Sequence, residues 1–232
     1  MMQEEDAARP PTRIVPVPLQ MVSAYLVMEE GVIVVDTGYP GSEETILEKL
    51  REAGAAPEDV TLILLTHCHA DHAGSAAALR LKTGGRIAIH RQDAENLRNG
   101  LQGRIRPLNL VGRLTGWFFE REAYSRYPAC DPDILIQDEL DLAPFGVRGR
   151  VITTPGHTAG SVSVILESGD ALVGDLIIPS VLSGKPGVPF WGESREEIRE
   201  SVRKVLACGP ERVHLAHGGM CQATAVREAF GR

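Results

Sequence analysis

The most reactive stretch of the chain is the run from residue 66 to residue 72, Thr-His-Cys-His-Ala-Asp-His, which holds three of the seven histidines. It follows the apolar residues 60–65, a pattern typical of a strand that ends in a loop. Side chains alternate along an extended segment, so His67 and His69 face the same way and can close on one ion. Asp71 and His72 come where the chain turns and can face a second ion. Because imidazole nitrogen and carboxylate oxygen are preferred ligands of Zn²⁺-type cations, the run predicts a metal site.

Three later segments place the same ligand types just past apolar strands. His157 follows residues 147–153 in a Gly-containing loop, Asp175 follows residues 171–173, and His217 follows residues 213–216. Each alone is a weak signal, since a His or Asp in a loop is usually solvated. Their shared placement at strand ends, together with the first cluster, makes the pattern a strong one.

On these residues the chain resembles the metallo-β-lactamase-fold metallohydrolase superfamily, whose signature is His-x-His-x-Asp-His followed by separated His, Asp and His ligands. The match spans about residues 30–220 and includes the strand end Asp36-Thr37-Gly38. The resemblance implies an α/β fold, a four-layer αββα sandwich of two packed mixed sheets with outer helices. It places the site at one edge of the paired sheets.

The resemblance also implies two divalent metal ions, most simply Zn²⁺, with Fe or Mn as alternatives. The implied ligands are His67, His69 and His157 for one ion, Asp71, His72 and His217 for the second, and Asp175 as the bridge between them. Asp36 would orient a ligand from outside the coordination sphere. Asp71 would in addition be catalytic, accepting a hydrogen bond from the nucleophile and helping to move its proton.

The implied activity is that of a dinuclear hydrolase, in which a metal-bridging hydroxide attacks an ester, thioester or lactone bond of a small molecule. The ligand set is glyoxalase II-like, but the chain fits a generic hydrolase branch. Zinc β-lactamases usually carry Cys or Ser at the position of Asp175, and acyl-homoserine lactonases have Tyr where this chain has Ile178. Residues 176–185 lack the Gly-Cys-Gly-Arg segment of glyoxalase II-like thioesterases.

Two other functions remain open on the same residues. In one, the chain is a mononuclear iron oxygenase similar to persulfide dioxygenases, in which His67, His157 and Asp175 hold a single Fe²⁺. The missing Gly-Cys-Gly-Arg segment argues against it. In the other, the metals only join two half-domains, which is disfavoured because seven ligands shared between two ions leave room for water.

Composition excludes several classes of partner. The 232 residues are 43% hydrophobic and 24% charged, with a net charge of -7, as expected of a globular domain. No basic stripe suits nucleic acid and no apolar run suits a membrane, so the expected partner is a small-molecule substrate, with the oligomeric state left open. The N-terminus lacks the features of a secretory signal, and the four cysteines show no paired spacing. Both points favour a cytoplasmic protein with reduced thiols.

The expected organisation is a disordered acidic tail at 1–12 and a single domain at 13–232, with a helical insert at about 91–128. The pattern of the insert fits a packed structural element at least as well as a substrate lid. Helices are predicted from the cap Ser42 to about 53, over about 73–82, and from the cap Ser194 to about 207.

Several further residues have a proposed role beside a simpler structural one. The aromatic segments 117–119 and 189–191 could line an acyl pocket or lie in the core. Lys185 and Arg195 could bind a substrate carboxylate, although solvated surface positions are the default. His90 and His214 match no ligand position and are interpreted as structural.

Overall fold

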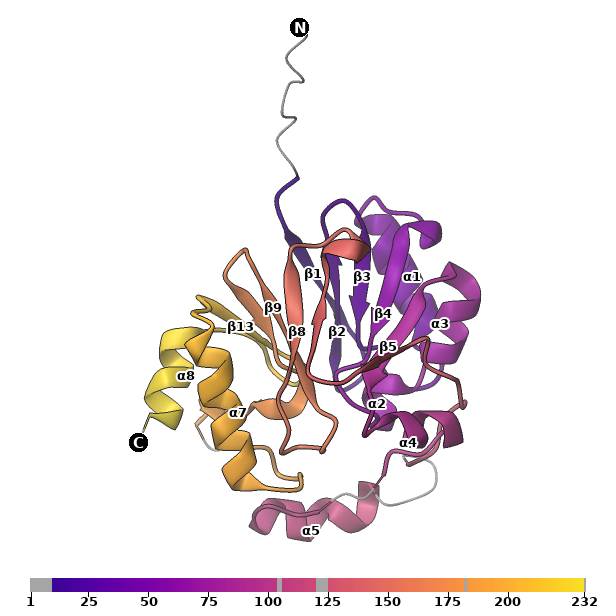
Figure 1. The fold of residues 1–232 in the computed structure, drawn as a ribbon. Coiled ribbons are helices and arrows are strands. Elements are labelled where there is room, and N and C mark those ends of the chain that lie inside the picture. Colours follow the sequence, from indigo (N-terminus) through magenta and orange to yellow (C-terminus); the bar gives the residue numbers. More distant parts are fainter. Residues whose placement is uncertain (1–9, 104–105, 120–124, 182, 232) are drawn as a thin grey trace, which may run out of the picture.

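The structure is a computed structural model that describes residues 10–103, 106–119, 125–181 and 183–231. The predicted N-terminal tail therefore lies largely outside the described residues. Most of the remainder forms two sheets packed face to face, each covered by helices on its outer side (Figure 1). This four-layer arrangement is the predicted αββα sandwich. Among the described residues, no helix combines the length and the apolar character needed to cross a membrane.

The two large sheets are both mixed. The first has the strand order β1 (Arg13–Pro18), β2 (Ser23–Met28), β3 (Val32–Val35), β4 (Val60–Leu64), β5 (Arg86–His90) and β6 (Ile134–Ile136). The second has the order β14 (Gly219–Gln222), β13 (Arg212–Leu215), β10 (Asp170–Leu172), β9 (Val162–Leu166), β8 (Gly149–Thr153) and β7 (Glu139–Asp141). Strands β3 to β6 are parallel, whereas β1 to β3 pair antiparallel. A small antiparallel pair, β11 (Ile178–Pro179) with β12 (Pro186–Gly187), stands apart.

Helices cover both outer faces of the sandwich. On the side of the first sheet these are α1 (Glu43–Glu52), α2 (Ala70–Ala73), α3 (Ala76–Thr83) and α4 (Ala94–Asn99), and on the side of the second α7 (Arg195–Ala207) and α8 (Ala223–Phe230). Helix α5 (Leu110–Phe119) lies at the lower end of the molecule in Figure 1. Three short 3-10 turns are η1 (Pro57–Asp59), η2 (Ala143–Phe145) and η3 (Gly174–Leu176).

Three apolar cores separate the four layers, and strand β3 contributes side chains to two of them. Its four residues are all buried, so the strand carries no polar face. Ile33 and Val35 point into the core between the sheets, while Val32 and Val34 point into the core beneath α1 and α3. Alternation along a strand buried on both faces produces this continuous apolar run. The third core lies between the second sheet and the helices α7 and α8.

The predicted helix over 73–82 is divided, with α2 ending at Ala73 and α3 starting at Ala76. A β-carbon on Gly74 would lie 2.6 Å from the Pro40 nitrogen, so only glycine allows this close approach. The Ser75 hydroxyl donates to the Tyr39 carbonyl at 2.7 Å and accepts from the Ser42 amide at 2.9 Å. The break thus fastens α2, which carries two of the predicted ligands, to the loop that precedes α1.

The two predicted helix caps differ. Ser194 precedes α7, and its hydroxyl accepts the Glu197 amide at 3.2 Å, as expected of an N-cap. Ser42 precedes α1, but its side chain makes no cap hydrogen bond. The predicted capping interaction at Ser42 was therefore wrong, because the backbone there is held by Ser75 instead.

Candidate metal centre

The seven predicted ligand side chains meet at one end of the two sheets. They come from the loop after β4 (His67, His69), helix α2 (Asp71, His72), the loop after β8 (His157), turn η3 (Asp175) and the segment after β13 (His217). Strand β9 is antiparallel to both β8 and β10, and β13 is parallel to β10, so β8, β10 and β13 all end at the same edge. The topology of the second sheet therefore delivers three of the side chains to one place.

The ligand atoms of these residues form three groups, and within each group all ligand atoms lie within 4.8 Å of one another. The groups are His67, His69 and His157; Asp71, His72 and His217; and His67, His72 and Asp175. The third group takes one histidine from each of the other two. Asp175 thus lies between two three-donor clusters, where a bridging ligand would have to be.

Unpartnered polar atoms identify what the cluster is built to hold. In the described part of the chain, five buried side-chain nitrogen or oxygen atoms have no hydrogen-bond partner, and four of them are here. They are Nε2 of His67, His69 and His72, and Oδ1 of Asp175, which lies at ion-pair distance, 3.3 Å, from Nε2 of both His72 and His217 without forming a hydrogen bond to either. Buried polar atoms without partners are rare because each carries an uncompensated desolvation cost. Four of them, converging from three segments, fit the nitrogen and oxygen donor set of a divalent cation.

Asp71 and Asp175 determine the charge of the half of the cluster that contains His72 and His217. Nε2 of His217 lies 3.3 Å from Asp71 Oδ2 and 3.3 Å from Asp175 Oδ1. Burial lowers the pKa of His217, but these carboxylates outweigh it and raise the pKa to about 10. His72 behaves alike: burial lowers its pKa, and Asp71, Asp175 and Asp36 raise it well above its usual value. In the absence of metal, protons compensate the negative charge of this half.

The other half of the cluster favours neutral imidazole. Burial lowers the pKa of His67, His69 and His157, to about 3 for His69. Neighbouring imidazoles lower the pKa of His67 and His69 further. Neutral imidazole has a free lone pair, which is the form that binds a metal ion. This half is therefore in its ligating state at neutral pH.

Asp36 contacts a predicted ligand, as the sequence suggested. Its Oδ2 accepts a hydrogen bond from His72 Nδ1 at 2.8 Å, and its Oδ1 accepts one from the Thr66 amide at 2.8 Å. The bond to Nδ1 leaves Nε2 of His72 facing the cluster. Asp36 also has a φ of 62°, a left-handed conformation that Asp and Asn tolerate better than most residues.

The sequence analysis missed Asp93, which stands at the N-terminus of α4. Its Oδ2 accepts the Cys68 amide at 3.1 Å and the Thr158 hydroxyl at 2.8 Å. One buried carboxylate thereby ties the loop carrying His67 and His69 to the loop carrying His157. In the sequence, an Asp that precedes a helix predicts an ordinary N-cap. The Asp93 side chain, however, makes no cap hydrogen bond.

A cavity of about 420 Å³ opens onto the cluster. Its lining includes His69, Asp71, His157, Asp175 and His217, together with Met21, Tyr39, Gln102, Ile178, Pro179, Val181, Pro189, Phe190, Trp191 and Gly218. The predicted aromatic segment 189–191 therefore lies on the cavity wall. Side chains of the other predicted segment, 117–119, lie outside the described set. Neither Lys185 nor Arg195 is among the described residues of the wall.

Trp191 connects the cavity wall, one ligand and the insert. Its carbonyl accepts a hydrogen bond from His157 Nδ1 at 2.9 Å, which leaves Nε2 of that ring toward the cluster. Its indole Nε1 donates to the Gly112 carbonyl at 3.1 Å, at the start of α5. The predicted 91–128 insert, which holds α4 and α5, therefore packs directly against residues that hold the site.

The two histidines interpreted as structural make contacts elsewhere. His90 Nε2 lies 2.9 Å from the Gln137 carbonyl. His214 Nε2 lies 2.8 Å from Asp170 Oδ1, and Asp170 also pairs with Arg212. Neither histidine belongs to the groups of potential ligands in the described residues.

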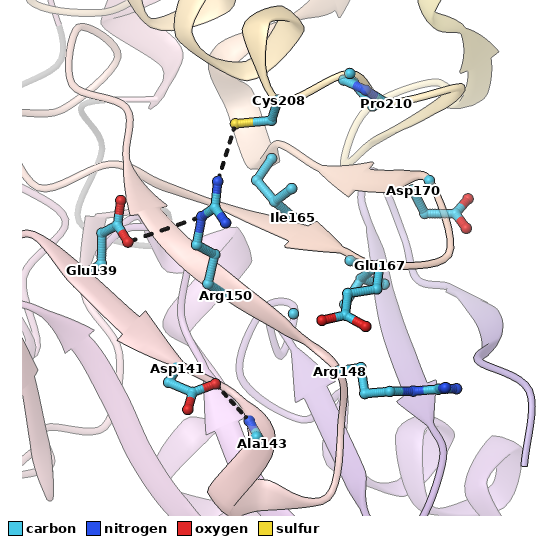
Figure 2. A pocket seen from close by; sticks show the side chains of 14 residues that line it. Glu139, Asp141, Ala143, Arg148, Arg150, Ile165, Glu167, Asp170, Cys208 and Pro210 are labelled. Carbon is cyan, nitrogen blue, oxygen red and sulfur yellow. Dashed lines mark hydrogen bonds and ion pairs between the residues drawn. The ribbon is translucent and has the colours of Figure 1, made fainter. Parts of the chain in front are cut away.

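A larger cavity, of about 670 Å³, lies at the opposite end of the second sheet. Figure 2 shows Arg150 there, reaching toward Cys208 on one side and Glu139 on the other. Two of the charged groups of this cavity form close ion pairs, Arg148 with Glu29 at 2.9 Å and Asp170 with Arg212 at 2.7 Å. Size alone therefore does not identify the site, since His69 and Asp175, two of the residues with unpartnered ligand atoms, line the smaller cavity.

Comparison with known proteins identifies the family. A family model described as the metallo-beta-lactamase superfamily matches residues 17–217. A probable metallo-hydrolase of Bacillus subtilis is 28% identical over 204 residues, covering 87% of this chain and 85% of its own. A hydroxyacylglutathione hydrolase of Cereibacter sphaeroides is 32% identical over 207 residues, covering 87% of this chain and 64% of its own.

Solved structures share the fold at lower identity. A metallo-beta-lactamase family protein of Thermus thermophilus superposes with a TM-score of 0.67 at 24% identity, covering 95% of this chain and 77% of its own. The BLEG-1 B3 metallo-beta-lactamase reaches a TM-score of 0.69 at 23% identity, covering 95% and 98%. At such identities the likeness concerns the fold alone.

Proposed function

The chain belongs to the metallo-β-lactamase superfamily and is a metal-dependent hydrolase, and from that premise we propose that it is a dinuclear enzyme acting on a small molecule. The proposed reaction is hydrolysis of an ester, thioester or lactone bond. Zn²⁺ is the proposed metal, because the donors are imidazole and carboxylate. Four free cysteines support the further proposal of a reducing, cytoplasmic location.

The observation that carries the proposal is the pairing of two three-donor groups through one carboxylate. His67, His69 and His157 would hold one ion, and Asp71, His72 and His217 the other. Asp175 shares a ligand group with a histidine of each set. A single ion held by His67, His69 and His157 would leave the buried Nε2 of His72 without a hydrogen bond, which is why two ions are the better fit.

Two bound divalent ions would supply an activated water and polarise the oxygen of the scissile bond. The protein's own contribution is to hold a carboxylate beside the reacting atoms. Asp71 lines the cavity, and although burial raises its pKa, His72 and His217 lower it to about 2. Asp71 is therefore ionised at neutral pH and can accept a proton from the nucleophile and pass it to the leaving group.

The cavity walls contribute by excluding water. Phe190 and Trp191 lie on the wall next to His157, where apolar side chains reduce the local dielectric constant. Charge that develops on the substrate would be less screened there than in bulk water. The same walls would hold the non-reacting part of a small substrate.

Hydrolysis assays with and without metal test the proposal. Purified protein should cleave 4-nitrophenyl acetate or an N-acetylcysteamine thioester, lose this activity on treatment with a chelator, and regain it with Zn²⁺. Asp175→Asn should remove most of the activity, by about 100-fold or more if the carboxylate acts on both ions. Undiminished hydrolysis in metal-free protein would contradict the proposal.

A further inference from the structure

We propose that the cavity at the metal centre selects substrates whose acyl group is uncharged and apolar, and discriminates against acyl groups that end in a carboxylate. This inference deepens the proposed function and rests on it for the reaction itself. The walls of the cavity carry the inference, independently of which bond is cleaved.

Apolar side chains form most of the wall beyond the ligands. They come from three separate segments: Met21 before β2, residues 178–181 around β11, and residues 189–191 before α7. Met21 and Val181 keep 56% and 72% of their surface exposed. Apolar side chains that remain exposed around a concave site are typical of ligand-binding surfaces.

Charged groups on the described wall are confined to the ligand set. Asp71 and Asp175 are the acidic side chains, and no lysine or arginine is among the described lining residues. Tyr39 and Gln102 add polar but uncharged side chains. The nearby Arg195 instead donates to the Leu108 carbonyl at 3.2 Å.

Among the described residues of the wall, a second carboxylate on the substrate would therefore meet no cationic side chain. An acyl chain whose carbonyl reaches the metal centre would place its far end among the apolar side chains. A carboxylate there would give up part of its hydration without gaining a cationic neighbour among the described wall residues, which disfavours binding. A methyl group at the same position would instead gain from leaving water.

Matched ligands that differ only at this far end test the inference. The substrates are 4-nitrophenyl pentanoate and mono-4-nitrophenyl glutarate, which have acyl chains of equal length. Their counterparts for binding are pentanohydroxamic acid and glutaric monohydroxamic acid, measured by calorimetry on zinc-loaded protein. We expect the neutral member of each pair to be favoured by at least about tenfold, in kcat/KM and in affinity, because the apolar wall gains from covering the methyl end and offers the carboxylate no cation among its described residues.

Val181→Lys provides a gain-of-function variant, since it adds one cation to the wall at an exposed position. The variant should reduce the ratio of kcat/KM for the pentanoate ester over the glutarate ester by about tenfold, because the added ammonium group can make a charge-assisted contact with the glutaryl carboxylate. Leu81→Lys is the matched control, because Leu81 is 87% exposed on α3 and is not part of the cavity wall. That variant should retain the wild-type preference.

The outcomes separate the inference from the proposed function. Equal or tighter binding of glutaric monohydroxamic acid would overturn the inference, whatever the enzyme hydrolyses. A preserved preference among the hydroxamic acids with no chelator-sensitive hydrolysis would support the cavity assignment and count against the proposed reaction. If Leu81→Lys reduced the ratio of pentanoate to glutarate hydrolysis as much as Val181→Lys does, the net charge of the protein rather than the cavity wall would determine substrate choice. That result would overturn the inference.

Discussion

Individual side chains at the centre are oriented by partners that are themselves held in place. His72 is held through Nδ1 by Asp36, and His157 is held through Nδ1 by the Trp191 carbonyl. In both rings the hydrogen bond at Nδ1 leaves Nε2 for the cluster. Such partners fix the tautomer of a metal-binding histidine and strengthen it as a ligand.

Replacing Asp36 by Asn should weaken metal binding while keeping the backbone conformation, because Asn also tolerates the left-handed region. One acceptor oxygen becomes a donor, so His72 or Thr66 loses its partner. We expect metal affinity to fall by about 10- to 100-fold. Competition against a zinc-sensitive dye measures it, with the exposed Asp131→Asn as the control. Equal affinities in both variants would argue against an orienting role for Asp36.

At the scale of elements, the ligand loops are held together by neighbours remote in sequence. Helix α4 brings Asp93 to the amide of Cys68 and the hydroxyl of Thr158. Tyr127 donates its hydroxyl to the Cys68 carbonyl at 2.7 Å. The segment between His67 and His69 is thus fixed on both its amide and its carbonyl, and the fixing residues belong to the 91–128 insert.

Asp93→Asn is expected to loosen the two loops without removing a ligand. The amide oxygen can take the place of Oδ2 and accept both bonds, but as a neutral acceptor it holds the Cys68 amide and the Thr158 hydroxyl less strongly than the carboxylate does. We expect a several-fold weaker affinity for the first metal equivalent and an altered visible spectrum of the cobalt-substituted protein. Glu95→Gln, on the exposed face of the same helix, should match the wild type. A cobalt spectrum identical to wild type in Asp93→Asn would contradict this account.

The elements that sequence could predict are those with a local signal. Strand β4 (Val60–Leu64) matches the strand predicted from the apolar residues 60–65, because an apolar run that ends in a loop marks a buried strand. The break between α2 and α3 was missed because it depends on Pro40 and Tyr39, which meet Gly74 and Ser75 only in the folded chain. The short pair β11 and β12 has no periodicity long enough to be recognised.

At the scale of the whole molecule, the positions of the seven candidate ligands along the sequence explain why the site could be predicted. The first four candidate ligands are adjacent in sequence, and the other three stand where strands end, so a sandwich that gathers strand ends also gathers them. The structure places all seven together. The orienting roles of Asp93 and of the Trp191 carbonyl could not be foreseen, because they come from hydrogen bonds across the fold and from a backbone group, which no residue type encodes.

The stability of the metal-free protein should depend on pH through the histidines of the cluster. In the metal-free protein the pKa of His217 is raised to about 10, so its contribution to stability is full below the unfolded value near 6.5 and is lost as pH rises toward 10. The pKa of His69 is lowered to about 3, so the unfolded chain binds more protons and stability falls as pH drops from about 6.5. The metal-free protein should therefore be most stable at about pH 6 to 7.

Bound metal adds a stabilisation that acidification removes, because protons compete for the imidazole ligands. Between about pH 7.5 and pH 5, on either side of the unperturbed His pKa, the thermal midpoint should fall further in zinc-loaded than in chelated protein. Scanning calorimetry on both samples measures the difference. Parallel declines would mean that the histidines of the cluster do not bind the metal.

Elemental analysis of the purified protein, combined with oxygen uptake, tests the dinuclear hydrolase most directly. The account predicts close to two divalent ions per chain, with zinc the best fit to the imidazole and carboxylate donors of His67, His72, Asp175 and their neighbours. It also predicts no oxygen consumption on glutathione persulfide. A single iron per chain, with oxygen consumed on that substrate, would contradict it and establish the mononuclear oxygenase instead.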